Sequence, residues 1–193
     1  AQDQSLLTRL EGEDKKKGLQ ISSIYIDDAA SAKKWGLKPV TATTPRECKR
    51  AVDDLYKKNA PVYVMILGAQ DVVPFQEIVN PTDDADSVVP TDLPYACDAP
   101  FSRQIDPFVG PTRVVGRLPD IPHKGDFKYL KTLLETSMAQ KPVQPIAYEK
   151  YFSISAYVWR KSTEQSLLNM FGHNGSLKLS PPEDEKYSKT ELK

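Results

Sequence analysis

The chain has 193 residues and a mass of 21.6 kDa, with 39% apolar residues, which suits one ordinary domain or part of a larger one. Its 26 basic and 26 acidic side chains cancel, which argues against a protein that binds nucleic acid or anionic membranes. No apolar run approaches a membrane-spanning length, and two cysteines cannot form a disulfide framework. The composition therefore favours a cytoplasmic protein with reduced thiols.

The polar residues 1–19 include a nearly continuous run of charge over 11–17, which predicts a solvated helix end or a loose lead-in. The next segment, 21–26, is short, rich in β-branched residues and followed by two aspartates. It predicts the first strand.

A capping box is the clearest local signal in the chain. Thr44, Pro45 and Glu47 occupy the cap, the first turn and the third helical position, so they predict a helix start. The continuous apolar run 62–67 then predicts a strand buried on both faces, as in a parallel sheet. With the strand at 21–26, these elements make a right-handed βαβ unit.

Residues 69–111 predict a long, irregular but ordered loop region, because apolar side chains are scattered among its seven prolines and seven aspartates. A short strand follows at 112–118. Asp126 then caps a predicted helix that extends to Ala139, and a linker follows at 141–145.

A third buried strand is predicted at 151–159. The capping box at 162–165 predicts a helix that stops at Gly172. Residues 177–179 are consistent with the start of a further strand. The charged tail 181–193 predicts an exposed, mobile segment.

Nucleophilic catalysis by cysteine requires a histidine within hydrogen-bond reach of the thiol. Cys48 falls on the apolar stripe of the first capped helix, which favours a core position. Cys97 lies in the loop region and is the better candidate, although a pairing of Cys97 with a histidine is the minor alternative. His123 and His173 both occupy turn-like sequences. No catalytic residue is therefore assigned within the chain.

Metal binding is conceivable at Asp83, Asp84 and Asp86, because clustered carboxylates suit calcium. Their spacing does not match an EF-hand loop, so a solvated acidic turn is the preferred interpretation. The chain also lacks a phosphate-binding glycine motif. We expect neither a metal nor a cofactor.

Two segments follow predicted strands at the position where α/β sheets bind ligands. Residues 68–71 fit a ligand-binding turn and a simple turn equally well. Trp159, which precedes Arg160 and Lys161, fits a flat binding wall, with ordinary packing as the alternative.

Two segments of the chain, 63–74 and 91–96, resemble parts of gingipain-type cysteine peptidases. Residues 63–74 resemble a strand that ends in a Gly-Asp turn followed by an apolar-Pro pair. Here Ala69 and Gln70 separate Gly68 from Asp71, a modest departure. Residues 91–96 resemble the Ser/Thr-Asp-x-x-Tyr segment of that family.

Three later segments extend the likeness over about 20–180. Residues 113–119 resemble the Val-Gly-Arg-apolar-Pro signature and are the most specific element. A helix at 126–139 and a strand at 152–159, followed by a capped helix, fall where the family has them.

The resemblance implies a caspase-like α/β fold, with a mostly parallel sheet and helices on both faces, incomplete in this chain. In that family a His-Gly pair and a cysteine follow two strands downstream of the matched segments. His173 does not fit, because Asn174 separates it from Gly175 and it follows a helix stop. The chain is thus expected to be the front part of a cysteine endopeptidase that lacks the catalytic pair.

The same resemblance implies that this chain contributes part of the substrate-binding wall. Trp159 is the expected wall of the first specificity pocket, and Asp92 is expected to order the loop or bind substrate. Family members that cleave after arginine place an acid directly after the matched strand. Here the nearest acid is Glu164, which is the third expected substrate-binding residue, although its position argues against an arginine pocket.

The expected organisation is a polar lead-in at 1–19, the front of the peptidase domain at 20–180, and a mobile tail or cleavage linker at 181–193. We expect a second chain from the same precursor to carry the catalytic His and Cys. The expected substrates are proteins or peptides. A cut after Lys193, by the enzyme itself or by another protease, would separate the two chains, unless the sequence is recorded only in part.

Two other classes of protein are consistent with the sequence. A caspase-like scaffold or regulatory module would keep the fold without its chemistry. A small-molecule or nucleotide-binding α/β domain is disfavoured, because the phosphate-binding loops are absent.

Overall fold

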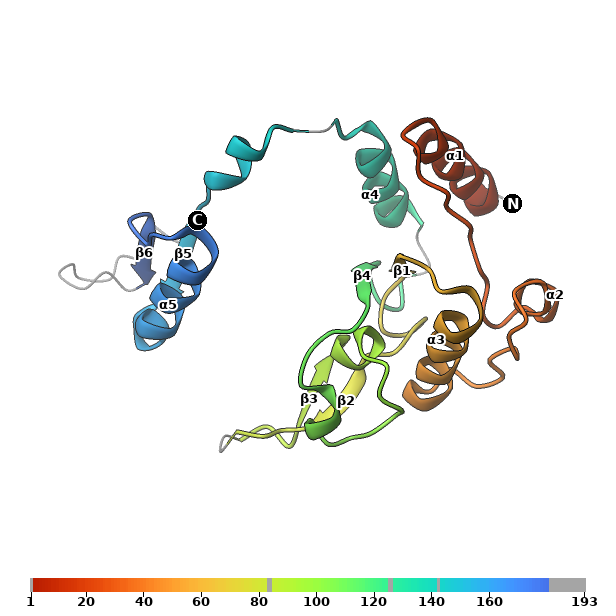
Figure 1. Ribbon diagram of the computed structural model, residues 1–193, viewed down its shortest axis with the longest axis horizontal. Helices are drawn as coiled ribbons and strands as arrows, with labels where there is room; N and C mark the ends of the chain where they lie inside the picture. Colours follow the sequence, from red (N-terminus) through yellow and green to blue (C-terminus); the bar gives the residue numbers. More distant parts are fainter. Residues whose placement is uncertain (1, 83–84, 125–126, 142, 181–193) are drawn as a thin grey trace. The chain divides into compact units, whose positions relative to one another are not determined.

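The computed structural model describes residues 2–82, 85–124, 127–141 and 143–180. The chain divides into two compact units, Ala1–Gln140 and Lys141–Lys193, which we call the N-terminal and C-terminal units (Figure 1). The expected domain over 20–180 takes in parts of both units. The charged tail 181–193 lies outside the described residues.

Helix α3 (Pro45–Asn59) begins as the capping box predicts. The Thr44 side chain accepts a hydrogen bond from the Glu47 backbone N–H at 3.2 Å, and Pro45 occupies the first turn. The helix ends at Ala60, which adopts a left-handed conformation with φ of 45°. Cys48, Ala51 and Val52 are buried, so the predicted apolar face is confirmed.

Strand β1 (Tyr63–Leu67) pairs in parallel with β4 (Val114–Leu118). Ile66 is buried in one core cluster with residues of α3. On the opposite face, Tyr63 and Met65 are 67% and 58% exposed, so the predicted burial on both faces is wrong. At the carboxyl end of the same face, Leu67 packs against a second core cluster.

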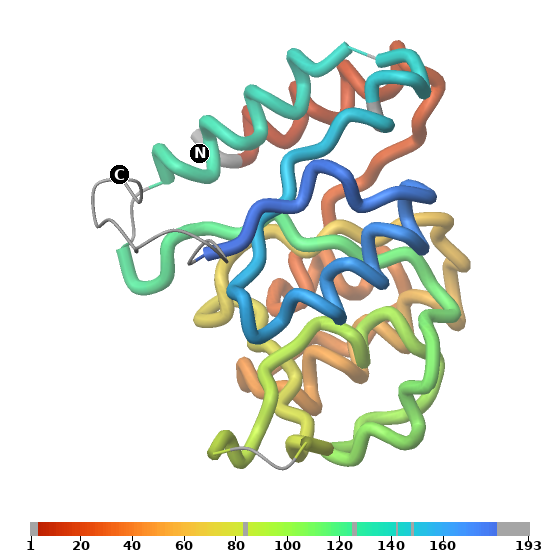
Figure 2. Tube along the Cα trace, turned by 90° about the vertical axis from the view of Figure 1, so that its left-hand side faces the viewer, coloured from red at the N-terminus to blue at the C-terminus, as the bar shows by residue number. Residues whose placement is uncertain are grey.

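Helices α1 (Gln2–Lys16) and α4 (Lys128–Ala139) form this second cluster and lie side by side in Figures 1 and 2. Leu6 and Leu10 of α1 are buried with Leu134 of α4. The predicted lead-in at 1–19 is therefore mostly a core helix. Leucines four residues apart share one helix face, and the charged run of 11–17 follows them, in the last turns of the helix and just past its end. The predicted cap Asp126 of α4 lies outside the described residues.

Residues 21–26 do not form the predicted strand. The Ser23 N–H donates to the Glu11 carboxylate at 2.8 Å, and the Tyr25 N–H donates to the Ser31 hydroxyl at 2.9 Å. Side chains thus take the hydrogen bonds that a neighbouring strand would satisfy. The predicted βαβ unit is wrong for the same reason. A short helix, α2 (Ala29–Lys34), follows.

The long connection from β1 to β4 is ordered, as predicted, but it contains an antiparallel hairpin that the sequence did not indicate. Its strands are β2 (Gln76–Val79) and β3 (Val88–Thr91). Two short 3-10 helices follow, η1 (Leu93–Ala96) and η2 (Asp106–Phe108). Ile78, Cys97 and Phe108 form a third core cluster.

The C-terminal unit contains two 3-10 helices, η3 (Pro145–Glu149) and η4 (Tyr157–Trp159), and a parallel strand pair. Strand β5 (Ser153–Ala156) pairs with β6 (Leu177–Ser180), which confirms the further strand at 177–179. The strand predicted at 151–159 is shorter than expected. It is also not buried, because Ile154 is 53% exposed.

Helix α5 (Arg160–Phe171) begins before the predicted capping box. Trp159 is its N-cap and provides no side-chain hydrogen bond, whereas Ser162 lies inside the first turn and donates to the Trp159 carbonyl at 2.9 Å. The predicted cap at 162–165 is therefore wrong. The predicted stop is confirmed, because Gly172 adopts φ of 73° at the C-cap.

The described residues thus form a mixed α/β structure, and the α/β class is confirmed. Their strands form three two-stranded sheets, of which β1–β4 and β5–β6 are parallel and β2–β3 is antiparallel. Among the described residues, no helix combines the length and the apolar character needed to cross a bilayer.

Candidate functional site

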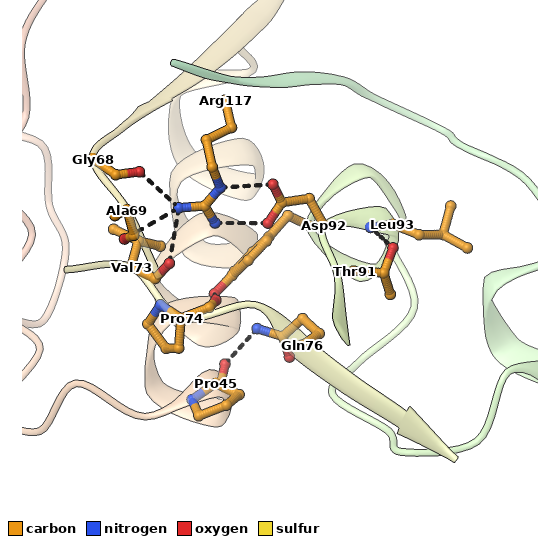
Figure 3. Close-up of polar contacts among 11 residues, drawn as sticks. Pro45, Gly68, Ala69, Val73, Pro74, Gln76, Thr91, Asp92, Leu93 and Arg117 are labelled. Carbon is orange, nitrogen blue, oxygen red and sulfur yellow. Dashed lines mark hydrogen bonds and ion pairs between the residues drawn. The ribbon is translucent and has the colours of Figure 1, made fainter. Parts of the chain in front are cut away.

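The carboxyl ends of the parallel strands β1 and β4 meet at one edge of their sheet. The chain turns there at Gly68, whose φ of 114° favours glycine and whose added Cβ would lie 3.2 Å from Val72. Arg117, near the end of β4, extends into this turn (Figure 3). Ligands bind at such edges in α/β proteins, so this is the first place to examine for a site.

The Arg117 guanidinium is almost completely buried and forms hydrogen bonds on every side. Its Nε and Nη2 donate to the two carboxylate oxygens of Asp92, at 2.8 and 2.7 Å. Its Nη1 donates to the carbonyls of Gly68 and Val73, at 3.0 and 2.9 Å, and more distantly to that of Ala69 at 3.5 Å. We call these five residues the Arg117 network (Figure 3).

Aromatic and amide side chains extend the network. The guanidinium carbon lies 4.7 Å from the ring centroid of Phe75. The Tyr95 hydroxyl donates to the Pro74 carbonyl at 2.7 Å, and burial raises the pKa of this phenol. Gln76 donates to the Pro45 carbonyl at 2.9 Å and so links the hairpin to the start of α3.

The network is a positioning device rather than an open binding site. A bidentate arginine–carboxylate pair has a fixed geometry, and here both carboxylate oxygens of Asp92 are engaged. Of the two roles expected for Asp92, the structure supports the ordering of the loop. Substrate would have to displace Arg117 to reach this carboxylate.

The other two expected substrate-binding residues, Trp159 and Glu164, lie at the start of α5 in the C-terminal unit. The Trp159 indole is 64% exposed, which does not fit the alternative of a packed core residue. Glu164 accepts a hydrogen bond from Nε of Arg160 at 2.8 Å. The three expected residues are therefore divided between the two units.

Neither cysteine has the environment of a nucleophile. Cys48 and Cys97 are each 1% exposed. Burial raises the pKa of Cys48 to about 11 and also raises that of Cys97, whose thiol lies 3.4 Å from the Gly110 carbonyl. A catalytic thiol requires the opposite shift and an accessible position, so the alternative of a Cys97–His pair is not supported.

The two histidines lie in turns, as predicted. The His123 N–H donates to the Asp71 carboxylate at 2.8 Å, and its ring lies 3.5 Å from the same oxygen. The hydrogen bond from this N–H lowers the pKa of Asp71. The His173 ring lies 3.2 Å from the Tyr151 hydroxyl. Neither ring is paired with a thiol of its own unit.

The described residues contain no group of three metal-ligating side chains. Asp83 and Asp84 lie outside the described residues. The Asp86 carbonyl accepts a hydrogen bond from the Asn80 side chain at 2.9 Å.

Two arginines, Arg113 and Arg117, were missed as site residues. Arg117 has a sequence signal, because it is a charged residue within the otherwise apolar strand of 114–118. Arg113 directly precedes the same strand and forms a separate charged cluster with α3.

Comparisons with family models, with curated proteins and with solved structures find no match to this chain.

Proposed function

We propose that this chain is the front part of a caspase-like, gingipain-type cysteine endopeptidase, and that the catalytic His and Cys lie outside it. One observation carries the proposal. The three segments that resemble this family at 63–74, 91–96 and 113–119 all meet in the Arg117 network. The resemblance therefore falls on residues that act together in space.

The proposed mechanism gives this chain a supporting role. A thiolate on a downstream segment, or on a second chain from the same precursor, attacks the scissile carbonyl of a protein or peptide substrate. A histidine on that segment protonates the leaving amine. The Arg117 network fixes the turn after β1, and the exposed Trp159 contributes to the substrate wall.

Covalent labelling of the complete precursor tests where the nucleophile lies. We expect iodoacetamide to abolish peptidase activity while modifying a cysteine other than Cys48 and Cys97, because both are buried. Peptide mapping by mass spectrometry identifies the modified residue. Inactivation that follows modification of Cys97 would refute the proposal.

The role of Trp159 is tested in the same precursor. We expect Trp159→Ala to reduce kcat/KM with little change in thermal stability, because the indole is exposed. Val158→Ala is the matched control, since Val158 is 75% exposed and adjacent. Equal losses in both variants would argue against a substrate wall at Trp159.

A non-catalytic scaffold is the second candidate, and the burial of both thiols and the pairing of Asp92 and Glu164 favour it. A complete precursor that cleaves no peptide in a broad substrate library, and that contains no reactive cysteine, would establish the scaffold in place of the peptidase.

A further inference from the structure

A second charged cluster lies between α3 and the start of β4, within the N-terminal unit. Oδ1 of Asp53 accepts hydrogen bonds from Nζ of Lys49 at 2.5 Å and from Nη1 of Arg113 at 2.6 Å. Nζ of Lys49 also donates to the Cys97 carbonyl at 3.0 Å. Two basic side chains thus share one carboxylate, which leaves one positive charge in excess.

Within this cluster, Arg113 has hydrogen-bond donors that no described residue engages. Its side chain is 93% buried, and its guanidinium carbon lies 4.5 Å from the ring centroid of Tyr56. Nη1 is engaged by Asp53, whereas no described residue accepts a hydrogen bond from the Nε–Nη2 edge. This edge is the fork that arginine presents to carboxylates.

Arg113 lines an open hollow of about 510 Å³ at the surface of the unit. The other walls are mainly apolar and include Pro61, Val62, Pro111 and Val114, with the Tyr56 ring. Val62 and Val114 are 73% and 55% exposed. The hollow lies where β1 and β4 begin, at the opposite ends of these strands from the Arg117 network.

We propose that this hollow binds a carboxylate carried by a partner polypeptide, with an apolar side chain beside it. The Nε–Nη2 edge of Arg113 would hold the carboxylate through two parallel hydrogen bonds, and the apolar walls would hold the neighbouring side chain. A monoanion matches the single excess charge. A phosphate dianion fits less well, because Asp53 lies beside the guanidinium and would repel the second negative charge.

The proposal does not depend on peptidase function, because its test measures binding alone. The probe is the blocked peptide acetyl-Ala-Leu-Asp-Ala-amide, and the neutral control has Asn in place of Asp. A third peptide, acetyl-Ala-Leu with a free C-terminus, separates a main-chain carboxylate from a side-chain carboxylate. Binding is followed by NMR through the backbone amide signals of Thr112 and Val114 in the full chain.

We expect the acidic or free-terminus peptide to shift these signals at millimolar concentration. The neutral peptide should bind at least about tenfold more weakly. Arg113→Gln should abolish the difference between the acidic and neutral peptides. Arg113→Lys should keep only part of the difference in binding between the acidic and neutral peptides, because an ammonium cannot donate two parallel hydrogen bonds to one carboxylate.

A second pair of variants does not disturb the buried cluster. Val62→Glu places a carboxylate in the hollow, so it should block the acidic peptide. Val109→Glu is the matched control, because Val109 is 93% exposed and does not line the hollow. It should leave binding unchanged.

Equal binding of the acidic and neutral peptides, or no binding of any carboxylate peptide, would overturn the proposal. So would an equal effect of Val62→Glu and Val109→Glu, which would indicate unspecific charge repulsion. Inorganic phosphate that shifts the same signals at lower concentration than acetate would overturn the assignment to a carboxylate.

Discussion

Arg117 is neutralised by one carboxylate, and its remaining hydrogen bonds go to backbone carbonyls. Asp92→Asn would remove the neutralising charge and leave the guanidinium buried. We expect this to lower the free energy of unfolding by about 2 kcal/mol, the range of a hydrogen bond to a charged group. Denaturant unfolding measures the change, followed by the fluorescence of Trp35 in a Trp159→Phe background.

Asp98→Asn is the control for this substitution. Asp98 is exposed and its carboxylate forms no hydrogen bond or ion pair with a described residue, so its replacement should change stability by less than about 0.5 kcal/mol. Equal effects of the two substitutions would mean that the Asp92–Arg117 pair contributes nothing specific to stability.

The raised pKa of Cys48 predicts a loss of stability at high pH. Below the ordinary value of 9.0 the thiol is neutral in both the folded and unfolded states, so its contribution is complete. Above that value the unfolded chain ionises first, and stability is lost as pH rises toward about 11. The loss should be on the order of 2 kcal/mol.

Comparison with Cys48→Ala isolates this effect, because Tyr95 titrates in both proteins. The difference in unfolding free energy between the native chain and the variant should shrink between pH 9 and 11. A difference that stays constant over this interval would show that the thiol does not ionise on unfolding.

At the scale of elements, α1 contributes to the core although its sequence is strongly charged. We expect Leu10→Ala to destabilise the N-terminal unit by about 2 kcal/mol, because Leu10 is buried against α4. Leu19→Ala is the matched control, since Leu19 is 49% exposed and lies outside the core clusters. If both variants unfold like the native chain, α1 does not hold the unit together.

Local signals were sufficient to predict some elements. Helix α3 follows from Thr44, Pro45 and an apolar face, and each of these signals acts within one or two turns. Residues 21–26 have the composition of a strand, but a strand also needs a partner, and pairing is a long-range property. The prolines at 74 and 90 concealed the hairpin, because proline usually interrupts strands.

The Arg117 network was less accessible from the sequence. Asp92 was singled out through the family resemblance, but Arg117 was not singled out as its partner. The other acceptors are backbone carbonyls. Because every residue carries one, the amino-acid sequence does not show which carbonyls will accept these hydrogen bonds. The hollow beside Arg113 was missed for a related reason, because its walls come from segments about fifty positions apart.

At the scale of the whole molecule, the two units differ greatly in their cores. The N-terminal unit contains three clusters of buried hydrophobic residues. In the described part of the C-terminal unit, the buried hydrophobic side chain is Leu167, whereas Phe152, Val158 and Met170 are largely exposed. So small a core cannot offset the loss of chain entropy on folding.

We therefore expect residues 141–193, produced alone, to show no cooperative thermal transition in circular dichroism. Residues 1–140, produced alone, should retain one and serve as the control. A cooperative transition in the shorter fragment would show that its core is sufficient by itself.

The Arg117 network also constrains how this sequence can diverge. Gly68, Ala69 and Val73 contribute carbonyls, so the arginine places no demand on their side chains. Asp92 contributes a negative charge, which among side chains only a second acidic residue can supply. In homologous chains, positions 92 and 117 should therefore change together, either as an acid–arginine pair or as a joint replacement by neutral residues.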